Sequence, residues 1–361
     1  MKILVTTTTI SMSEYFILSY IKKKYPETIL HCVKINYQHK DNELYKKKMI
    51  AKIKKVVINK NITHIICLFE EVFFIARIKE WLEKHSKILI NTTEIYETLH
   101  NKHNGYKFSI AHNIPTIPTM LLINDITKHQ IETFIGKQYP AYVKEVYSYD
   151  GRGTHTCSDI GELFNSDGKI KDQNIGRIIQ PCIKGTIYTA TAIYSKGNMI
   201  DKFILKSTTF INDTKTVRMP PFCEVIKTDI FDEYMRNIGK NTGYSGMLEV
   251  EFLVNNTGKI HLMEYNPRFS GSFICATYSD ASIAKNYMNI LFGLPIIPFY
   301  QKEIIYSFGI GSDIQYFMQQ IYCNPKSFLN RSWLMKYIKI RRNSEDIPIT
   351  RYSSADYEYI V

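Results

Sequence analysis

Short apolar runs alternate with helical patterns through the first ninety residues. The apolar runs predict strands, and the longer stretches with apolar residues three or four positions apart predict helices. Apolar strands separated by helices indicate a parallel sheet covered on both faces. No GxGxxG motif follows the first strand, which disfavours a dinucleotide-binding domain and favours a Rossmann-like supporting or substrate-binding domain. The strands are expected at residues 2–8, 29–36, 62–69 and 87–91, and the helices at residues 13–24, 41–56 and 71–85.

The pattern changes near Thr92. A predicted helix over residues 94–112 leads into IPTIPT (114–119), whose two prolines mark an extended linker. The region that follows predicts a helix at 127–136, a strand at 141–146, a helix beginning at Ser158 and a strand at 177–183.

Longer strands dominate the next hundred residues. The helix predicted among them, residues 229–242, carries Ile230, Tyr234 and Ile238 on one side. The last sixty residues mix predicted helices and strands without a recognisable motif. The long strands are expected at residues 186–195 and 198–210, joined at SKGN, and at residues 246–256 and 259–266, joined at Thr257-Gly258.

The composition is that of a globular protein with more than one domain. The chain has 361 residues, of which 45% are hydrophobic and 22% charged, and this length favours two or three domains. No uncharged apolar run is long enough to span a membrane, and the start of the chain lacks the apolar core of a signal peptide. We therefore expect a cytoplasmic location. The seven cysteines are scattered without a CxxC pair, which argues against a zinc site and against a disulfide framework.

The formal charge of +12 raises the question of a nucleic-acid partner. Dense basic clusters occur only at residues 21–25, 45–55 and 337–342, and no RNP-like aromatic stripe or recognition-helix pattern accompanies them. Solvated helix faces or strand edges explain these clusters, and attraction of an anionic substrate or surface is the functional alternative. Nucleic acid is therefore not expected as a partner.

Acidic side chains gather on one face of the predicted hairpin. In LEVEF (248–252), period-two alternation places Glu249 and Glu251 on the face opposite the three apolar residues, and the partner strand adds Glu264 and Asn266. Carboxylates this close repel one another unless a cation lies between them, and Mg²⁺ takes a few carboxylates together with substrate phosphates. For Glu249, a solvent-facing strand acid is an equally good interpretation.

A lysine and a glycine-rich loop are candidates to bind the substrate phosphates at such a metal site. Lys144 lies in the middle of the strand AYVKEV, where a lysine is unfavourable unless its ammonium group has a partner. SYDGRGT (148–154) follows, and its glycines let backbone amides approach phosphate oxygens closely. A plain surface turn would explain this loop equally well if it stood alone.

The order of these features resembles the ATP-grasp superfamily, specifically its carboxylate–amine ligases and members like the large subunit of carbamoyl-phosphate synthase. The resemblance covers about residues 95–295. Family members carry a lysine before a helix that ends in Gly-Ile-Pro-x-Pro, and here Lys102 fits, with Asn113 where the glycine usually stands. A second lysine on a strand before a glycine-rich loop matches Lys144, and the family's E-x-N-P-R motif matches residues 264–268.

The resemblance implies ATP and Mg²⁺ as cofactors, with one or two metal ions and Mn²⁺ able to substitute. Arg268 would orient a carboxylate or stabilise an oxyanion. Lys206 and Arg218 lie where relatives often bind substrate anions, although a surface salt bridge would explain either residue. The remaining implied roles are phosphate binding by Lys102 and Lys144, a phosphate loop at Ser148, Gly151 and Gly153, adenine contact through the hinge at Gln180, Cys182 and Ile183, and metal binding by Glu251, Glu264 and Asn266.

The resemblance also implies the reaction, which is ATP-dependent ligation of a small-molecule carboxylate to an amine through an acyl phosphate. It implies an α/β architecture with a Rossmann-like pre-grasp domain and a two-subdomain ATP-grasp core, and a homodimer is common among relatives. The expected segments are the pre-grasp domain (1–93), the small-subdomain region with the lysine strand (94–183), the large subdomain with the metal-binding hairpin (184–298) and an extension of unknown role (299–361).

Two departures from the family pattern leave other functions open. Pro181 stands in the hinge where relatives often have an acid, and Ile187 stands near the position of a ribose-binding acid. The alternatives are a phosphotransferase or a carboxyphosphate-transferring enzyme on the same fold, and a nucleotide-binding protein that has lost catalysis.

Overall fold

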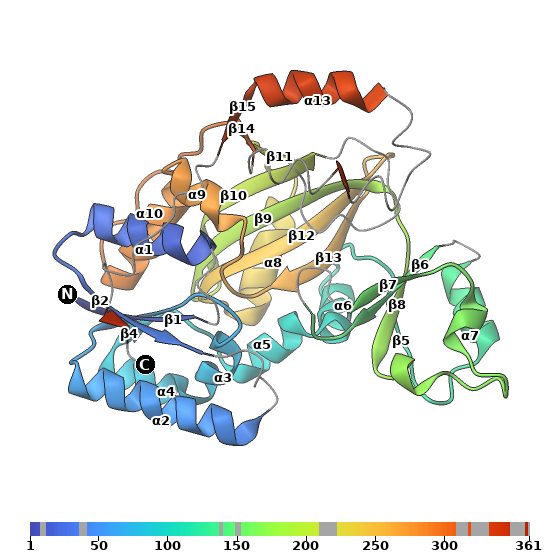
Figure 1. Ribbon diagram of the computed structural model, residues 1–361, viewed down its shortest axis with the longest axis horizontal. Helices are drawn as coiled ribbons and strands as arrows, with labels where there is room; N and C mark the ends of the chain where they lie inside the picture. Colours follow the sequence, from blue (N-terminus) through green and yellow to red (C-terminus); the bar gives the residue numbers. More distant parts are fainter. Residues whose placement is uncertain are drawn as a thin grey trace.

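Three β-sheets organise the part of the chain that the computed structural model describes (Figure 1). The described residues are 1–7, 12–35, 42–136, 140–148, 153–208, 222–307, 317–318, 332–346 and 358–359.

The N-terminal sheet has five strands in the order β16-β2-β1-β3-β4, and all of its pairs are parallel. This confirms the parallel sheet that the alternation of apolar strands and helices predicts. One strand, β16, comes from the last sixty residues, where the sequence predicts strands without giving their positions. The strands are β1 (Lys2–Thr7), β2 (Ile29–Lys34), β3 (His64–Cys67), β4 (Lys87–Ile88) and β16 (Glu358–Tyr359).

Helices cover both faces of this sheet because its side chains point alternately to opposite sides. Leu4 packs with Ile53 of α2, whereas Val5 packs with Ile21 of α1. The helix predicted over 71–85 is interrupted by a 3₁₀ turn. The helices are α1 (Met12–Lys24), α2 (Glu43–Asn59), α3 (Val72–Ile75) and α4 (Lys79–His85), with η2 (Ala76–Ile78) between the last two.

A smaller antiparallel sheet follows, in the order β5-β8-β6-β7. The helix predicted from Ser158 is wrong, because only a short 3₁₀ turn forms there and Asp159 caps it by accepting from Gly161 N at 2.7 Å. The elements are β5 (Met120–Leu121), α7 (Lys128–Ile135), β6 (Ala141–Glu145), β7 (Thr154–Cys157), η3 (Ile160–Leu163), η4 (Asp172–Asn174) and β8 (Arg177–Pro181).

The third sheet has seven strands in the order β13-β12-β9-β10-β11-β14-β15. Its pairs are antiparallel except β14–β15, which is parallel. The strands are β9 (Gly185–Ser195), β10 (Asn198–Thr208), β11 (Phe222–Val225), β12 (Gly246–Asn255), β13 (Ile260–Asn266), β14 (Ile304–Ser307) and β15 (Ser344–Asp346).

The helix α8 (Asp232–Thr242) packs on one face of the seven-stranded sheet. Met235 and Ile238 are the buried apolar side chains of this helix. The predicted apolar side is therefore partly wrong, since Ile230 precedes the helix and is 49% exposed.

Two further helices, α9 (Phe273–Tyr278) and α10 (Ser282–Phe292), share a core with α1 and with the other face of the seven-stranded sheet. This shared core joins the N-terminal sheet to the central sheet, and Figure 1 shows α1, α9 and α10 lying together between them. The helix α13 (Ser332–Arg342) lies beside β15 at the top of the same view.

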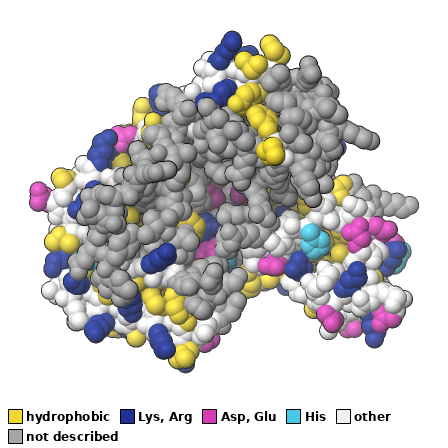
Figure 2. Space-filling view, in the orientation of Figure 1, with side chains coloured by type: hydrophobic (Ala, Val, Ile, Leu, Met, Phe, Trp, Pro, Cys, Tyr) yellow, Lys and Arg dark blue, Asp and Glu magenta, His cyan; other side chains and the backbone are white. Residues whose placement is uncertain are grey.

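The bulk properties of the described residues can be compared with the expectations from composition. No helix in the described part of the chain is long and apolar enough to cross a membrane. No disulfide forms among the described cysteines, which are Cys32, Cys67, Cys157, Cys182, Cys223 and Cys275. Among the described residues on the face in Figure 2, Lys and Arg side chains are scattered and do not gather into one patch.

Candidate functional site

The acidic pair predicted on the hairpin is present in the β12–β13 register. Glu251 pairs with Glu264, and Glu249 pairs with Asn266, so that all four side chains share one face of the sheet. The register shifts directly beyond the Glu251–Glu264 pair, where β13 contains one extra residue, Met263. Such bulges locally bend a strand and re-aim its side chains.

Glu249 is not the solvent-facing acid that one interpretation of the sequence allowed. Its side chain is buried, with the residue 4% exposed. The hydroxyl groups of Ser270 and Ser272 donate to Oε2, and Asn266 Nδ2 donates to Oε1 at 3.3 Å. Burial raises the pKa of Glu249, although the serine hydroxyl groups and the nearby Arg268 oppose the rise.

Lys102 reaches this face from a helix start that the sequence analysis missed. The helix predicted over 94–112 is divided into α5 (Thr93–His100) and α6 (Lys102–Ala111). Asn101 ends the first helix and caps the second, because its side-chain oxygen accepts from His103 N and Asn104 N at 3.0 and 3.1 Å. Asn is a favoured N-cap residue, and this was the available signal.

The ammonium group of Lys102 connects the phosphate-loop segment to the acidic pair. Lys102 Nζ donates to the Ser148 carbonyl oxygen at 2.8 Å and to Ser148 Oγ at 3.1 Å. It also lies 3.4 Å from Glu264 Oε2. Residues 102, 148 and 264, each predicted separately, therefore meet at one point.

Close packing of α6 on β13 fixes the position of Lys102. A side chain at Gly105 would meet the ring of Tyr265 at 3.0 Å, and the Tyr265 hydroxyl group lies 2.6 Å from Ser109 Oγ. Asn113, which stands where relatives carry glycine, has a φ of 55°. Asn tolerates this left-handed conformation better than most residues, so the departure from the family pattern preserves the turn.

Lys144 lies on β6 between β7 and β8, opposite Thr154 and Ile178. Burial lowers the pKa of its ammonium group, and the nearby carboxylate of Glu264 opposes that effect. The charge of Lys102 also lowers the pKa of Lys144, and the charge of Glu251 raises it. The lysine strand and the acidic hairpin, which belong to different sheets, therefore form one charged cluster.

The pKa values of the two carboxylates in the pair shift in opposite directions. Burial, Glu264 and Glu249 raise the pKa of Glu251 well above its usual range. Burial also acts to raise the pKa of Glu264, but the ammonium groups of Lys102 and Lys144 outweigh it and lower the pKa overall. Repulsion between the two carboxylates is what a cation placed between them would relieve.

The loop and hinge residues flank this cluster. Gly153 has a φ of 66°, a left-handed conformation that favours glycine. Gln180 is buried on β8 and donates to Thr119 Oγ1 at 2.8 Å. Cys182 and Ile183 are partly buried in the short connection from β8 to β9, which joins the small sheet to the large one.

The two departures from the family pattern lie at the same connection. Pro181 is the last residue of β8 and pairs with Ala141. Ile187 lies on β9 and pairs with Leu253. Neither position carries an acid, as the sequence shows.

Arg268 is held in the turn after β13. Its Nη1 donates to the Phe269 carbonyl oxygen at 2.9 Å, and its guanidinium carbon lies 5.3 Å from the centre of the Phe69 ring. Its Nε lies 3.6 Å from Oε1 of Glu70. The sequence pattern predicts no contact of Arg268 with Phe69 or Glu70, because nothing local marks a contact between segments nearly two hundred residues apart.

The remaining predicted residues have different outcomes. Lys206 forms an ion pair with Glu224 at 3.2 Å, which confirms the salt bridge that was the alternative explanation for this lysine. Gly151 and Arg218 lie outside the described residues.

The donor atoms at the cluster fit a magnesium ion. Mg²⁺ is usually bound through one or two carboxylates together with substrate phosphates, and here Glu251, Glu264 and the amide oxygen of Asn266 lie on one face. No group of three or more His, Cys, Asp and Glu side chains within the described ranges could hold a metal by itself. The ligand set therefore suits an ion that is shared with a phosphate substrate.

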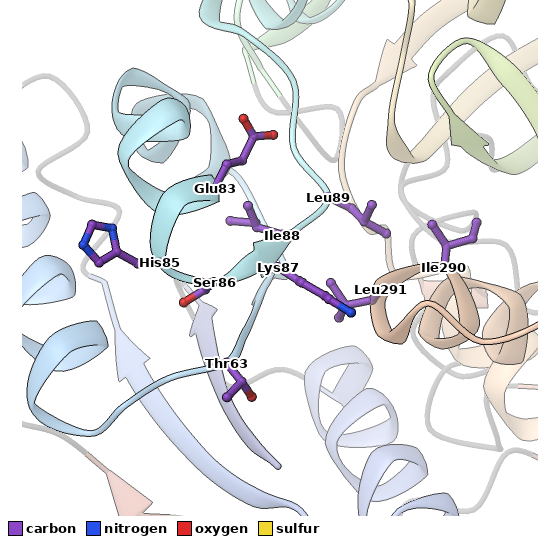
Figure 3. A pocket seen from close by; sticks show the side chains of 9 residues that line it. All are labelled: Thr63, Glu83, His85, Ser86, Lys87, Ile88, Leu89, Ile290 and Leu291. Carbon is purple, nitrogen blue, oxygen red and sulfur yellow. The ribbon is translucent and has the colours of Figure 1, made fainter.

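A cavity of about 650 Å³ lies elsewhere, between β4 and α10. Figure 3 shows Lys87 reaching toward α10 beside Leu291. Its ammonium group lies 3.5 Å from the carbonyl oxygen of Phe292. The residues that line this cavity include none of the predicted site residues, so the charged cluster remains the candidate site.

Comparison with known proteins gives one curated relative and several solved structures. No protein-family model matches the chain. The arginine-specific large chain of carbamoyl phosphate synthase from Halalkalibacterium halodurans is 22% identical over 293 residues, which are 78% of this chain. The chain spans only 27% of the length of that relative.

The similar solved structures are enzymes of several kinds. The L-amino acid ligase of Bacillus licheniformis has a TM-score of 0.60 and 13% identity, over 80% of this chain and 74% of its own. The biotin carboxylase domain of the Hydrogenobacter thermophilus 2-oxoglutarate carboxylase, solved with MgADP, ADP and bicarbonate, has a TM-score of 0.60 and 16% identity, over 83% and 71%. The N5-carboxyaminoimidazole synthetase of Staphylococcus aureus, solved with ADP, has a TM-score of 0.63 and 13% identity, over 90% and 86%. The chain therefore has the ATP-grasp fold that its lysines and its E-x-N-P-R motif predict.

Proposed function

We propose that this protein is an ATP- and Mg²⁺-dependent ligase that joins a small-molecule carboxylate to an amine through an acyl phosphate. The observation that carries the proposal is the convergence of Lys102, Lys144, Glu251 and Glu264 from three separate parts of the chain. Two ammonium groups close enough to two carboxylates to affect each other's pKa suit a substrate that brings both phosphates and a divalent cation.

Each residue of the cluster has a defined task in this proposal. Lys102 and Lys144 bind the phosphates of ATP, and Ser148 with Gly153 forms part of the loop that covers them. Glu251, Glu264 and Asn266 hold Mg²⁺, which neutralises charge on the transferring phosphoryl group. The backbone of the hinge between β8 and β9 contacts the adenine, with Gln180, Cys182 and Ile183 as the contact positions.

The proposed chemistry has two steps. An oxygen of the substrate carboxylate attacks the γ-phosphorus atom, the bond to the β-phosphate oxygen breaks, and ADP leaves. The amine then attacks the acyl carbon and loses a proton, and phosphate departs with one oxygen that came from the carboxylate. Arg268 offers a planar fork of donors for the carboxylate and for the oxyanion that forms in the second step.

The proposal extends to the organisation of the chain. Residues 1–93 form a Rossmann-like pre-grasp domain, residues 94–183 the small-subdomain region, and residues 184–298 the large subdomain with the metal-binding hairpin. Support comes from the three sheets, which divide along these segments except that the C-terminal residues contribute β14 and β15 to the large sheet and β16 to the N-terminal one.

A second candidate function is the transfer of carboxyphosphate. It is favoured by the similarity to the biotin carboxylase domain that was solved with bicarbonate. In that case bicarbonate replaces the organic carboxylate, and the product is a carboxylated amine. A strict bicarbonate requirement for ADP release separates this candidate from the first.

Release of ADP, measured over a panel of amino acids and small acids with mass spectrometry of the product, tests the proposal. An ¹⁸O-labelled carboxylate adds a direct test, because ligation through an acyl phosphate transfers one labelled oxygen to the released phosphate. Unlabelled phosphate, or a stable phosphorylated product with no amide, would contradict the ligase mechanism. The Glu264→Gln variant is the matched control, since it removes one carboxylate charge at nearly constant volume.

A further inference from the structure

Glu249 is a buried carboxylate beside the proposed metal ligands. In the β12–β13 register it stands directly opposite Asn266, one residue pair beyond Glu251 and Glu264. Its Oε1 accepts from Asn266 Nδ2 at 3.3 Å, and its Oε2 accepts from the hydroxyl groups of Ser270 and Ser272. Both oxygens are thus engaged inside the protein.

The contact between these two side chains determines which way the amide of Asn266 faces. A side-chain amide has an NH₂ group that donates and a carbonyl oxygen that accepts. The NH₂ group of Asn266 lies between two carboxylates, at 3.3 Å from Glu249 Oε1 and 3.5 Å from Glu264 Oε1. Since the two ends of the amide point apart, its carbonyl oxygen faces away from these two carboxylate oxygens, and oxygen is the ligand atom that Mg²⁺ takes.

The position of Glu249 is itself fixed by the loop that follows β13. Ser270 and Ser272 both donate to the same carboxylate oxygen, and their own hydroxyl oxygens lie 2.5 Å apart. This loop begins directly after Arg268. The two serine hydroxyl groups therefore hold the Glu249 oxygen that does not contact Asn266, and the β12 backbone fixes the base of the side chain.

We propose that Glu249 is a positioning residue that holds the Asn266 amide with its carbonyl oxygen toward the metal. The inference rests on the proposed function, because the metal is that of the ATP site. Groups that orient a metal ligand in this way typically contribute about 10- to 100-fold to metal affinity. Glu249 binds no metal itself in this arrangement.

An exchange of amide and carboxylate between the two positions tests this role. Glu249→Gln allows the Asn266 amide to turn over, because the new NH₂ group can face its carbonyl oxygen. Asn266→Asp places a carboxylate against a carboxylate. The double variant Glu249→Gln/Asn266→Asp restores one donor facing one acceptor and keeps the original net charge. All of these changes leave side-chain volume nearly constant, which limits the effect on folding.

The main measurement is the affinity of each variant for Mn²⁺ at saturating ADP, by electron paramagnetic resonance. The control measurement is the affinity for ADP in EDTA, by calorimetry. Each single variant is expected to bind Mn²⁺ about 10- to 100-fold more weakly than wild type, with ADP affinity in EDTA unchanged. The double variant is expected to bind Mn²⁺ within about tenfold of wild type, which is tighter than the product of the two single losses predicts.

Two results would overturn the role of Glu249: wild-type Mn²⁺ affinity in Glu249→Gln, or losses that simply multiply in the double variant. If a single variant fails to fold, the double variant decides, because it must bind Mn²⁺ within about tenfold of wild type. A wild-type protein that binds ADP but no Mn²⁺ would overturn the proposed function as well, and this separates the two failures.

Discussion

Arg268 and Glu70 form a buried ion pair between the turn after β13 and the segment after β3, with 3.6 Å between Nε and Oε1. Their side chains are 6% and 3% exposed. The ring of Phe69 lies against the same guanidinium group. The N-terminal sheet therefore orients the arginine of the proposed active site, which connects the stability of that sheet to the geometry of the site.

Glu70→Gln is expected to destabilise the protein by about 3 kcal/mol, because it removes the ion-pair partner of the buried guanidinium group. The measurement is the free energy of unfolding in urea. Glu83→Gln is the matched control, since Glu83 pairs with Lys79 on an exposed helix and its loss should change stability by less than about 1 kcal/mol. Equal effects of the two substitutions would show that the Arg268 pair has no special importance.

Glu71 is expected to make stability depend on pH. Its carboxylate accepts from Thr6 Oγ1 at 3.0 Å and from Leu68 N at 2.9 Å. Burial nevertheless raises its pKa from 4.5 to about 7. The native state then keeps a proton that the unfolded chain releases, so the stabilisation is fully present below about pH 4.5 and is lost as the pH rises to about 7.

The matched variant Glu71→Gln isolates this effect from all other titrating groups. Between about pH 5 and pH 8, the free energy of unfolding of the wild type should fall relative to the variant by on the order of 2 to 3 kcal/mol. Urea unfolding at the two pH values measures the difference. A gap between the two proteins that stays constant with pH would rule out the raised pKa.

Lys102→Ala is expected to weaken ADP binding by at least about tenfold, because it removes the proposed charge-assisted contact with the phosphates and the group that holds Ser148 beside Glu264. Lys107→Ala provides the control, as Lys107 lies on the same helix but is exposed. Calorimetric titration with ADP compares the two. Similar losses in both variants would indicate a general effect of positive charge instead of a specific contact.

The sequence predicts those parts of the fold that depend on local patterns of apolar and polar residues. Period-two alternation is enough to place Glu251 and Glu264 on one face, because adjacent strands of a hairpin share their faces. The sequence also places Lys144 in the middle of a predicted strand, where its ammonium group needs a partner. Asn101 is a favoured N-cap residue, and it is where the structure divides the single helix predicted over residues 94–112.

Other parts of the site depend on contacts that no local pattern encodes. Alternation gives the face on which Glu249 lies, but its burial comes from Ser270 and Ser272 in a loop that folds back over the sheet. The pairing of Glu70 with Arg268 arises only when the N-terminal sheet packs against the central one. Both depend on tertiary structure, which overrides what the strand pattern indicates.

The most direct test of a metal–nucleotide site at the charged cluster is calorimetric titration of the wild type and Glu264→Gln with ADP, in Mg²⁺ and in EDTA. The wild type should bind ADP at least about tenfold more tightly with Mg²⁺, and Glu264→Gln should lose that difference while keeping its fold. A wild type that does not bind ADP, or a variant that keeps the full Mg²⁺ dependence, would contradict the assignment.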